Sequence, residues 1–250
     1  YHEDPESYAK EFRELEQLRG LACRPRVDFE CVATVKRYYS QLHSLQNRFP
    51  LSSENELLEF AWKDIYSGSM LHSSNIKYEM ASIFYNIAAL HSQLGIEESR
   101  SDPESMKIAC THFQCAAWVF GEMKNLYPLI LKGDLTTELM IFMQQISFAQ
   151  AQECILEKSL ADNRKPAIIA KVTAQVISFY NAALSALFSQ NEDGSMQDLV
   201  GSKLYKDWLK YIKFKTSYLS SILFLYQGMN SEEQRKMGER VALYNAACDK

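Results

Sequence analysis

The chain has 250 residues, of which 47% are hydrophobic and 23% charged, as in ordinary soluble globular proteins with one large domain or two small ones. Its net charge of −4 gives no support for a duplex DNA-binding protein, which needs a concentrated basic footprint. Only 9 glycines and 6 prolines occur, which disfavours hairpin-rich folds and favours long helices joined by short loops.

The first 73 residues predict two helices followed by a break in the helical pattern. Asp4-Pro5-Glu6 puts a capping aspartate before a proline, and apolar residues then recur at helical spacing as far as Leu21. A second helix is predicted from Asp28 to Phe49, where Pro50 ends it. Within residues 51–73, the run 57–62 fits either a short strand or an irregular segment.

From residue 75 onward the pattern is helical almost without a pause. The predicted helices are 75–95, 103–127, 135–161, 166–189, 200–228 and 231–250. Their short connections predict antiparallel neighbours. We therefore predict an all-α fold, an elongated array of antiparallel helix pairs resembling a tetratricopeptide solenoid, although no motif recurs at a fixed period.

Sequence motifs for phosphate binding, zinc proteases and serine hydrolases are absent from the chain. The one candidate metal cluster is Cys110, His112 and Cys115. On a helix, Cys110 and His112 point to nearly opposite sides, and a structural zinc site needs four ligands. We interpret the cluster as core cysteines with a partly buried histidine, and we predict a protein that is not an enzyme and holds no metal.

Cysteine usage and the lack of a signal peptide predict a reduced, cytosolic protein. The six cysteines form no C-x-x-C pair, and no N-glycosylation sequon is present. The longest uncharged stretch, residues 172–191, carries too many polar side chains to sit well in a bilayer. We predict that this stretch is a buried helix.

The helix predicted at residues 166–189 carries two apolar stripes, whereas a surface helix needs one. One stripe comprises Ile169, Val176, Tyr180, Ala183 and Leu187. The other, offset by roughly 80° at helical geometry, comprises Ile168, Val172 and Phe179. Burial of both stripes between neighbouring helices fits this pattern. The second stripe also fits an exposed groove that accepts the i, i+3, i+4 and i+7 anchors of a partner helix.

The following helix has a basic face, formed by Lys203, Lys206, Lys210 and Lys213. A solvated outer face fits this pattern. A surface that attracts acidic peptide or anionic lipid fits it as well, and four lysines do not decide between the two. An anionic-membrane-surface binding module is therefore the alternative functional hypothesis.

Several blocks of the sequence resemble a single family from one end of the chain to the other. The blocks are residues 77–95, 106–117, 149–159, 162–165, 175–176 and 238–242. The chain is identified as a member of the BRO-one (Alix-type) domain family. Within this family it most resembles the domain of a His-domain-containing tyrosine phosphatase. We predict a single domain over residues 1–250. It lacks the family's N-terminal strand-forming segment and C-terminal closing portion, so we expect truncation at both ends.

The resemblance implies a banana-shaped, non-catalytic adaptor that acts in cargo sorting into multivesicular endosomes. Its implied partner is the C-terminal amphipathic helix of an ESCRT-III subunit of the charged multivesicular body protein four class, and other endosomal adaptors are implied for the same groove. The family's groove positions match Thr111, Ile155, Ile168 and Val172 here. We further predict a cytoplasmic monomer that is recruited to endosomes, with no cofactor, no nucleic acid partner and at most peripheral contact with membranes.

Overall fold

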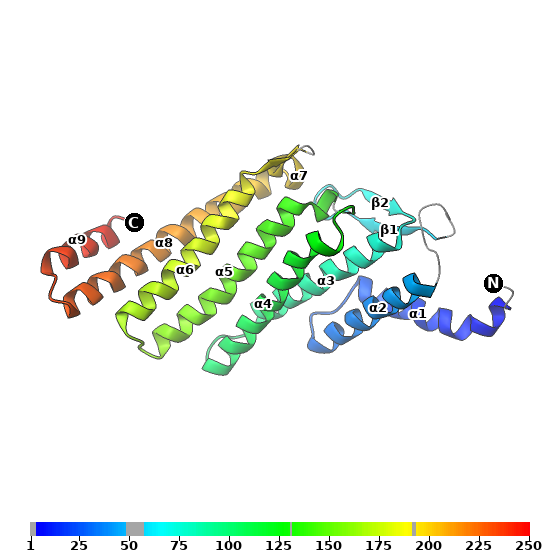
Figure 1. Cartoon of the computed structure of the whole chain (residues 1–250), viewed down its shortest axis with the longest axis horizontal. Helices are drawn as coiled ribbons and strands as arrows, with labels where there is room; N and C mark the ends of the chain where they lie inside the picture. The colour runs from blue at the N-terminus through cyan, green and yellow to red at the C-terminus, as the bar shows by residue number, and fades with distance from the viewer. Residues whose placement is uncertain (1–3, 49–57, 131, 192–193) are drawn as a thin grey trace.

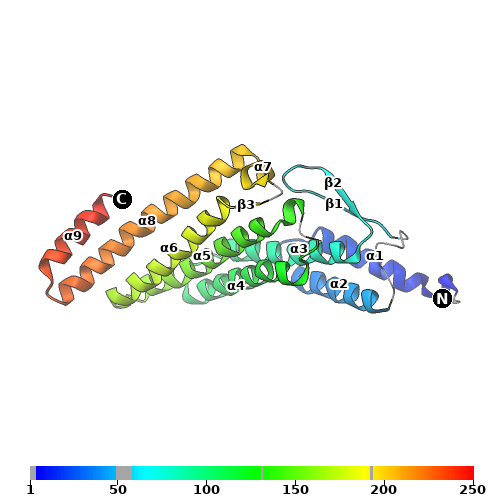
Figure 2. The same ribbon diagram turned by 45° about the horizontal axis from the view of Figure 1, so that its top comes forward.

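The computed structural model describes residues 4–48, 58–130, 132–191 and 194–250, which form an elongated, curved array of helices (Figure 1). At the N-terminal end, the 3-10 helix η1 (Pro5–Tyr8) leads into α1 (Ala9–Cys23), which pairs with α2 (Phe29–Arg48). The central helices are α3 (Ile76–Glu97), α4 (Pro103–Leu126), α5 (Thr137–Ala161) and α6 (Pro166–Leu187). The long α8 (Ser202–Glu233) and α9 (Met237–Cys248) form the other end (Figure 2). The predicted all-α array is confirmed.

Two helical segments start at the predicted Asp-Pro-Glu signals. The Asp4 carboxylate accepts a hydrogen bond from the backbone N–H of Glu6 at 3.0 Å. The Asp102 carboxylate accepts from the backbone N–H groups of Glu104 and Ser105, at 2.9 and 3.0 Å. These caps satisfy amides that have no partner inside the helix. The end of the second predicted helix, at Phe49 and Pro50, lies outside the described residues.

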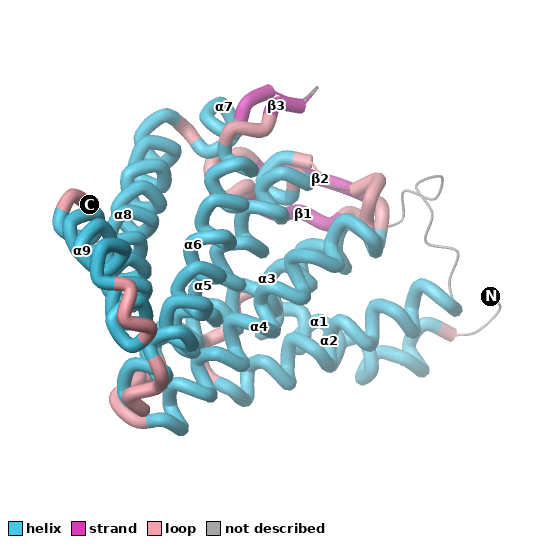
Figure 3. The backbone as a smooth tube through the Cα atoms, turned by 60° about the vertical axis from the view of Figure 1, so that its left-hand side comes forward, coloured by secondary structure: helices cyan, strands magenta, loops and turns pink. Residues whose placement is uncertain are grey.

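The predicted strand near residues 57–62 forms one half of a β-hairpin beside α3 (Figure 3). β1 (Phe60–Lys63) pairs antiparallel with β2 (Met70–Ser73), and Trp62 lies opposite Leu71. Leu57 lies outside the described residues. The sequence missed β2 because a four-residue strand is too short for its alternation to stand out.

The boundary between the last two helices differs from the prediction of helices at 200–228 and 231–250. Gly228 lies inside α8, where a Cβ atom would come within 2.4 Å of Cε1 of Tyr244 in α9. The glycine therefore permits close packing of the two helices. The turn falls later, at Arg235, which has a φ of 60°, and the N–H of Lys236 donates to the Ser231 carbonyl at 2.8 Å.

The connection between α6 and α8 contains short elements that the sequence did not predict. β3 (Gln190–Asn191) pairs antiparallel with β4 (Gly194–Ser195), and α7 (Met196–Val200) follows. Gly201, with a φ of 84°, separates α7 from α8. A further 3-10 helix, η2 (Gly133–Leu135), precedes α5.

Within the part of the chain that the structure describes, α6 alone is long and apolar enough to span a membrane by length and composition. One third of its most apolar 18-residue window is buried. Ile169, Val176 and Tyr180 are at most 2% exposed and belong to the main core, which α6 shares with α5 and α8. Core helices of soluble proteins pass the same test, so we interpret α6 as a core helix with one open side.

One buried carboxylate joins the N-terminal helix pair and the hairpin to α3. Glu79 is fully buried and accepts two hydrogen bonds from the Arg19 guanidinium, at 2.8 and 3.2 Å. The Tyr38 hydroxyl donates to it at 2.9 Å and the Trp62 indole N–H at 2.6 Å. Four donors from α1, α2 and β1 thus compensate the cost of burying this charge.

Candidate partner-binding groove

A groove of about 520 Å³ is lined by α4, α5, α6 and the turn between α5 and α6. All four groove residues expected from the sequence line it together: Thr111 from α4, Ile155 from α5, and Ile168 and Val172 from α6. Ile168 is 44% exposed and Ile155 36%, and Val172 is half-buried. The structure thus brings residues from three helices into one apolar strip that solvent can reach.

The two stripes of α6 have different surroundings. Ile169, Val176, Tyr180, Ala183 and Leu187 are all buried, each 2% exposed or less. The second stripe, with Ile168, Val172 and Phe179, stays at the surface or half-buried. Of the two interpretations that the periodicity allowed, the structure therefore contradicts burial of both stripes. Pro166 lies at the first position of α6 and fixes the residue at which the helix begins.

The walls of the groove are apolar or neutral, and its rim is basic. Burial raises the pKa of the Cys154 thiol to about 11 and also raises the pKa of Cys110, so both stay protonated and act as small hydrophobic groups. Lys107, Lys158 and Arg164 lie at the rim with a single carboxylate, Asp162. Arg164 and Asp162 approach to 3.3 Å. The rim therefore carries a net positive charge.

A buried ion pair supports the groove from behind. Glu153, two residues before Ile155, is 8% exposed and accepts hydrogen bonds from Lys215 Nζ at 2.9 and 3.1 Å. The Tyr180 hydroxyl donates to the same carboxylate at 3.0 Å. These contacts tie α5, α6 and α8 together and fix the orientation of the groove wall.

The candidate metal cluster does not assemble. Cys110 lines the groove, whereas His112 is 8% exposed and packs on the other side of α4 against His91 of α3. Phe29 of α2 contacts the His112 ring with centroids 6.3 Å apart. No three His, Cys, Asp or Glu side chains of the described ranges are grouped so that they could hold a metal ion. His112 is thus a core residue, and nothing in the spacing of the histidines indicated its partner.

The four lysines of the basic face all lie exposed on α8, whereas the groove is lined by α4, α5, α6 and the α5–α6 turn. No carboxylate among the described residues lies within ion-pair distance of Lys203, Lys206, Lys210 or Lys213. Phe214, next to Lys213, is 66% exposed. The structure therefore leaves a basic surface with an exposed aromatic ring.

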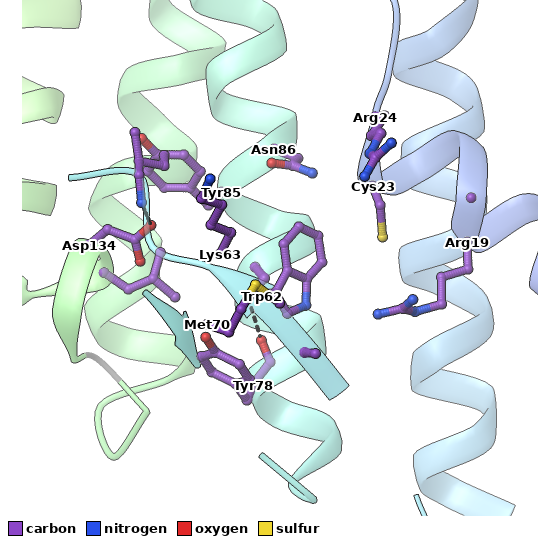
Figure 4. Close-up of a pocket in the computed structure, with 15 residues that line it drawn as sticks. Arg19, Cys23, Arg24, Trp62, Lys63, Met70, Tyr78, Tyr85, Asn86 and Asp134 are labelled. Atoms are coloured by element: carbon purple, nitrogen blue, oxygen red, sulfur yellow. Dashed lines mark hydrogen bonds between the residues drawn. The ribbon is translucent and has the colours of Figure 1, made fainter. Parts of the chain in front are cut away.

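A second cavity, of about 630 Å³, lies between α1, the β-hairpin and α3 (Figure 4). Arg24, Lys63, Tyr78 and Tyr85 are among its lining residues, and burial raises the pKa of both tyrosines to about 12. None of the candidate site residues expected from the sequence lines it. The sequence could not reveal this cavity, because its walls come from segments far apart in the chain.

The model of the BRO1-like domain family matches residues 1–250. Tyrosine-protein phosphatase non-receptor type 23 of Mus musculus and that of Homo sapiens are each 41% identical to the chain over 251 residues. Vacuolar protein-sorting protein BRO1 of Gibberella zeae is 31% identical over 248 residues. These matches cover 99–100% of this chain but only 14%, 15% and 24% of the respective relatives.

Solved structures of ALIX have the same fold. An ALIX BRO1 CHMP4C complex matches with a TM-score of 0.85 and 26% identity over 99% of this chain and 70% of that chain. ALIX in complex with the SIVmac239 PYKEVTEDL late domain matches with a TM-score of 0.83 and 26% identity, over 97% of this chain and 35% of that chain. The BRO1-like domain is a non-catalytic scaffold, and this chain belongs to the BRO1-like domain family.

Proposed function

We propose that the chain is an adaptor that captures the C-terminal amphipathic helix of an ESCRT-III subunit of the charged multivesicular body protein four class. The observation that carries the proposal is the apolar strip of Ile155, Ile168 and Val172 at the surface of one groove. Exposed apolar strips of this kind mark interaction sites. A related ALIX domain has been solved as a complex with CHMP4C, which supports the same class of partner here.

The shape and chemistry of the groove suit a helix better than a small molecule. Ile168 and Val172 lie one helical turn apart on α6, with Ile155 of α5 beside them, as the anchors of an amphipathic helix require. The basic rim favours acidic residues on the flanks of the incoming helix. In this proposal Thr111 forms the α4 wall of the groove and contacts the partner.

The cellular role follows from the partner. The relatives include vacuolar sorting proteins, and we propose that this chain works in endosomal sorting and multivesicular body formation, as a cytoplasmic monomer recruited to endosomes. Other endosomal adaptors would compete for the same groove. Any phosphatase activity of a longer protein would reside outside this domain.

Two neighbouring isoleucines provide the test. Ile168→Asp changes a side chain that is 44% exposed, so the variant should keep its helical circular dichroism while a titration with the synthetic ESCRT-III helix shows no binding. Ile169→Asp is the matched control, because Ile169 is 2% exposed and a buried unpaired carboxylate costs several kcal/mol, enough to unfold the domain. Unchanged helix binding by folded Ile168→Asp would refute the adaptor proposal.

A second candidate function is binding to anionic membrane surfaces through Lys203, Lys206, Lys210 and Lys213. It is favoured by the exposure of these lysines without ion-pair partners among the described residues and by exposed Phe214 beside them. Co-sedimentation with phosphatidylserine vesicles at low and moderate salt tests it. Binding that is insensitive to salt and to the double substitution Lys206→Glu and Lys210→Glu would reject it.

A further inference from the structure

Three aromatic side chains that solvent can reach lie on α4, α5 and α6 outside the lining of the groove, and one of them, Trp118, also contacts Phe84 of α3 with ring centroids 6.2 Å apart. Trp118 of α4 is 60% exposed, and Phe148 of α5 and Phe179 of α6 are half-buried. The rings of Phe148 and Phe179 stack with their centroids 5.3 Å apart. We call Trp118, Phe148 and Phe179 the aromatic step. Tryptophan is among the residue types enriched where partner proteins bind most tightly.

Each residue of the aromatic step lies seven positions from a groove residue on the same helix. The pairs are Thr111 and Trp118, Ile155 and Phe148, and Val172 and Phe179. On α4 and α6 the aromatic residue comes seven positions after the groove residue, and on α5 it comes seven positions before it. The helix α5 runs antiparallel to α4 and α6 (Figure 1). All three displacements therefore have the same direction. Seven residues are almost two helical turns, about 10 Å, so each pair shares one face of its helix.

A row of three glutamines separates the groove from the aromatic step: Gln114 on α4, Gln152 on α5 and Gln175 on α6. Gln114 and Gln175 are exposed and Gln152 is half-buried, and Gln114 also lines the groove. Among the described residues, none of the three side-chain amides has a hydrogen-bond partner. Each amide can both donate and accept, so the row fits polar side chains one turn away from apolar anchors.

We propose that the docking surface continues over the glutamine row to the aromatic step, and that its partner is a longer amphipathic helix with two apolar anchor clusters about seven residues apart. The proposal rests on the helix-binding function above. The first cluster contacts Ile155, Ile168 and Val172, and the second contacts the aromatic step. A helix with the first cluster alone leaves the exposed ring of Trp118 uncovered. The aromatic step therefore distinguishes long partner helices from short ones.

Three synthetic peptides test this proposal: the ESCRT-III C-terminal helix, and the same helix extended by two turns at either end, with a leucine seven residues beyond its last anchor. One extended peptide should bind about tenfold more tightly than the short one. Trp118→Ala should abolish that gain and leave the affinity of the short peptide unchanged, and Phe179→Ala should abolish the gain as well. The tryptophan emission of the chain should shift to the blue with this extended peptide only, and Trp118→Ala should remove the shift.

The controls separate failure of this proposal from failure of the proposed function. Leu129→Ala, which removes an 89% exposed side chain outside the docking surface, should leave every affinity unchanged. Circular dichroism tests whether Phe179→Ala is folded. If this variant is unfolded, Trp118→Ala alone tests the proposal. Equal affinity for all three peptides would overturn only the proposal that the aromatic step binds the partner. A gain in affinity for the extended peptide that survives in folded Trp118→Ala or Phe179→Ala would do the same. Unchanged binding of the short peptide by Ile168→Asp would overturn the proposed function of the groove itself.

Discussion

The Nδ1 atoms of His91 and His112 lie 3.0 Å apart inside the α3–α4 interface, where the two side chains are 4% and 8% exposed. Only one proton fits between these atoms, so one imidazole donates and the other accepts. Burial, and then the positive charge of Lys36 on α2 and the neighbouring His112, lower the pKa of His91 to about 4. Burial also lowers the pKa of His112, against the opposing effect of Glu98.

This pair should make the domain sensitive to acid. A histidine whose pKa is lower in the folded state binds fewer protons there than in the unfolded chain. The contribution of neutral His91 to stability is therefore complete above the pKa of about 6.5 that a histidine has in the unfolded chain. It is lost as the pH falls from there towards 4. Urea unfolding between pH 7.5 and 4.5 should show this loss. In the variant His91→Gln the slope over this range should be smaller, and an unchanged slope would assign the acid sensitivity to other groups.

The buried Glu79 carboxylate should be among the strongest single contributors to stability. Glu79→Ala leaves the Tyr38 hydroxyl and the Trp62 indole N–H without their acceptor, and it strands the Arg19 guanidinium. We expect a loss of about 3 kcal/mol in the free energy of unfolding, measured with denaturant. Glu14→Ala, which removes an exposed pair with Lys10 at 3.8 Å, is the control and should change it by less than about 0.5 kcal/mol. Equal effects of the two would contradict the assigned role.

Two glycines in helices should respond to alanine in opposite ways. Gly228→Ala would bring a methyl group against the rigid Tyr244 ring and push α9 away from α8, at a cost of about 1–3 kcal/mol. Gly20→Ala in α1 meets no atom within 4 Å, so it should stabilise the helix by about 0.5–1 kcal/mol. Thermal unfolding compares the two. Early proteolytic cleavage of α9 in Gly228→Ala alone would locate the effect, and stabilisation by both substitutions would refute the packing explanation.

A larger side chain at position 172 should strengthen partner binding. Val172 is half-buried at the edge of the groove, and leucine adds one methylene, worth about 0.8 kcal/mol when a partner covers it. Val172→Leu should therefore tighten binding of the ESCRT-III helix by about fourfold in a titration. Val241→Leu, at a 53% exposed position on α9, should have no effect. Weaker binding by Val172→Leu would mean that the groove is already filled at this position.

The long helices and the α6 wall of the groove were predictable from the sequence, because both depend on periodicity within one helix. The stripe of Ile168 and Val172 is visible as spacing along α6, and the family resemblance added Thr111 and Ile155 from other helices. Periodicity could not decide which stripe faces solvent, because that depends on which helices pack on either side of α6.

Features that depend on contacts between distant segments were missed. The partner of His112 lies 21 residues away on α3, and nothing in the spacing of the histidines indicates their contact. The end of α8 was placed too early because the sequence does not reveal that Gly228 meets Tyr244. The hairpin partner of β1 was missed because β2 has only four residues.

The Glu153–Lys215–Tyr180 cluster behind Ile155 has a consequence for kinetics. Because this cluster holds three helices in one arrangement before any partner arrives, the loss of conformational entropy on association falls on the incoming peptide alone. Peptides that differ in their anchors would then meet the same rigid receptor at similar encounter rates. Discrimination among them would lie in their residence times, so competition among partners would be decided by dissociation.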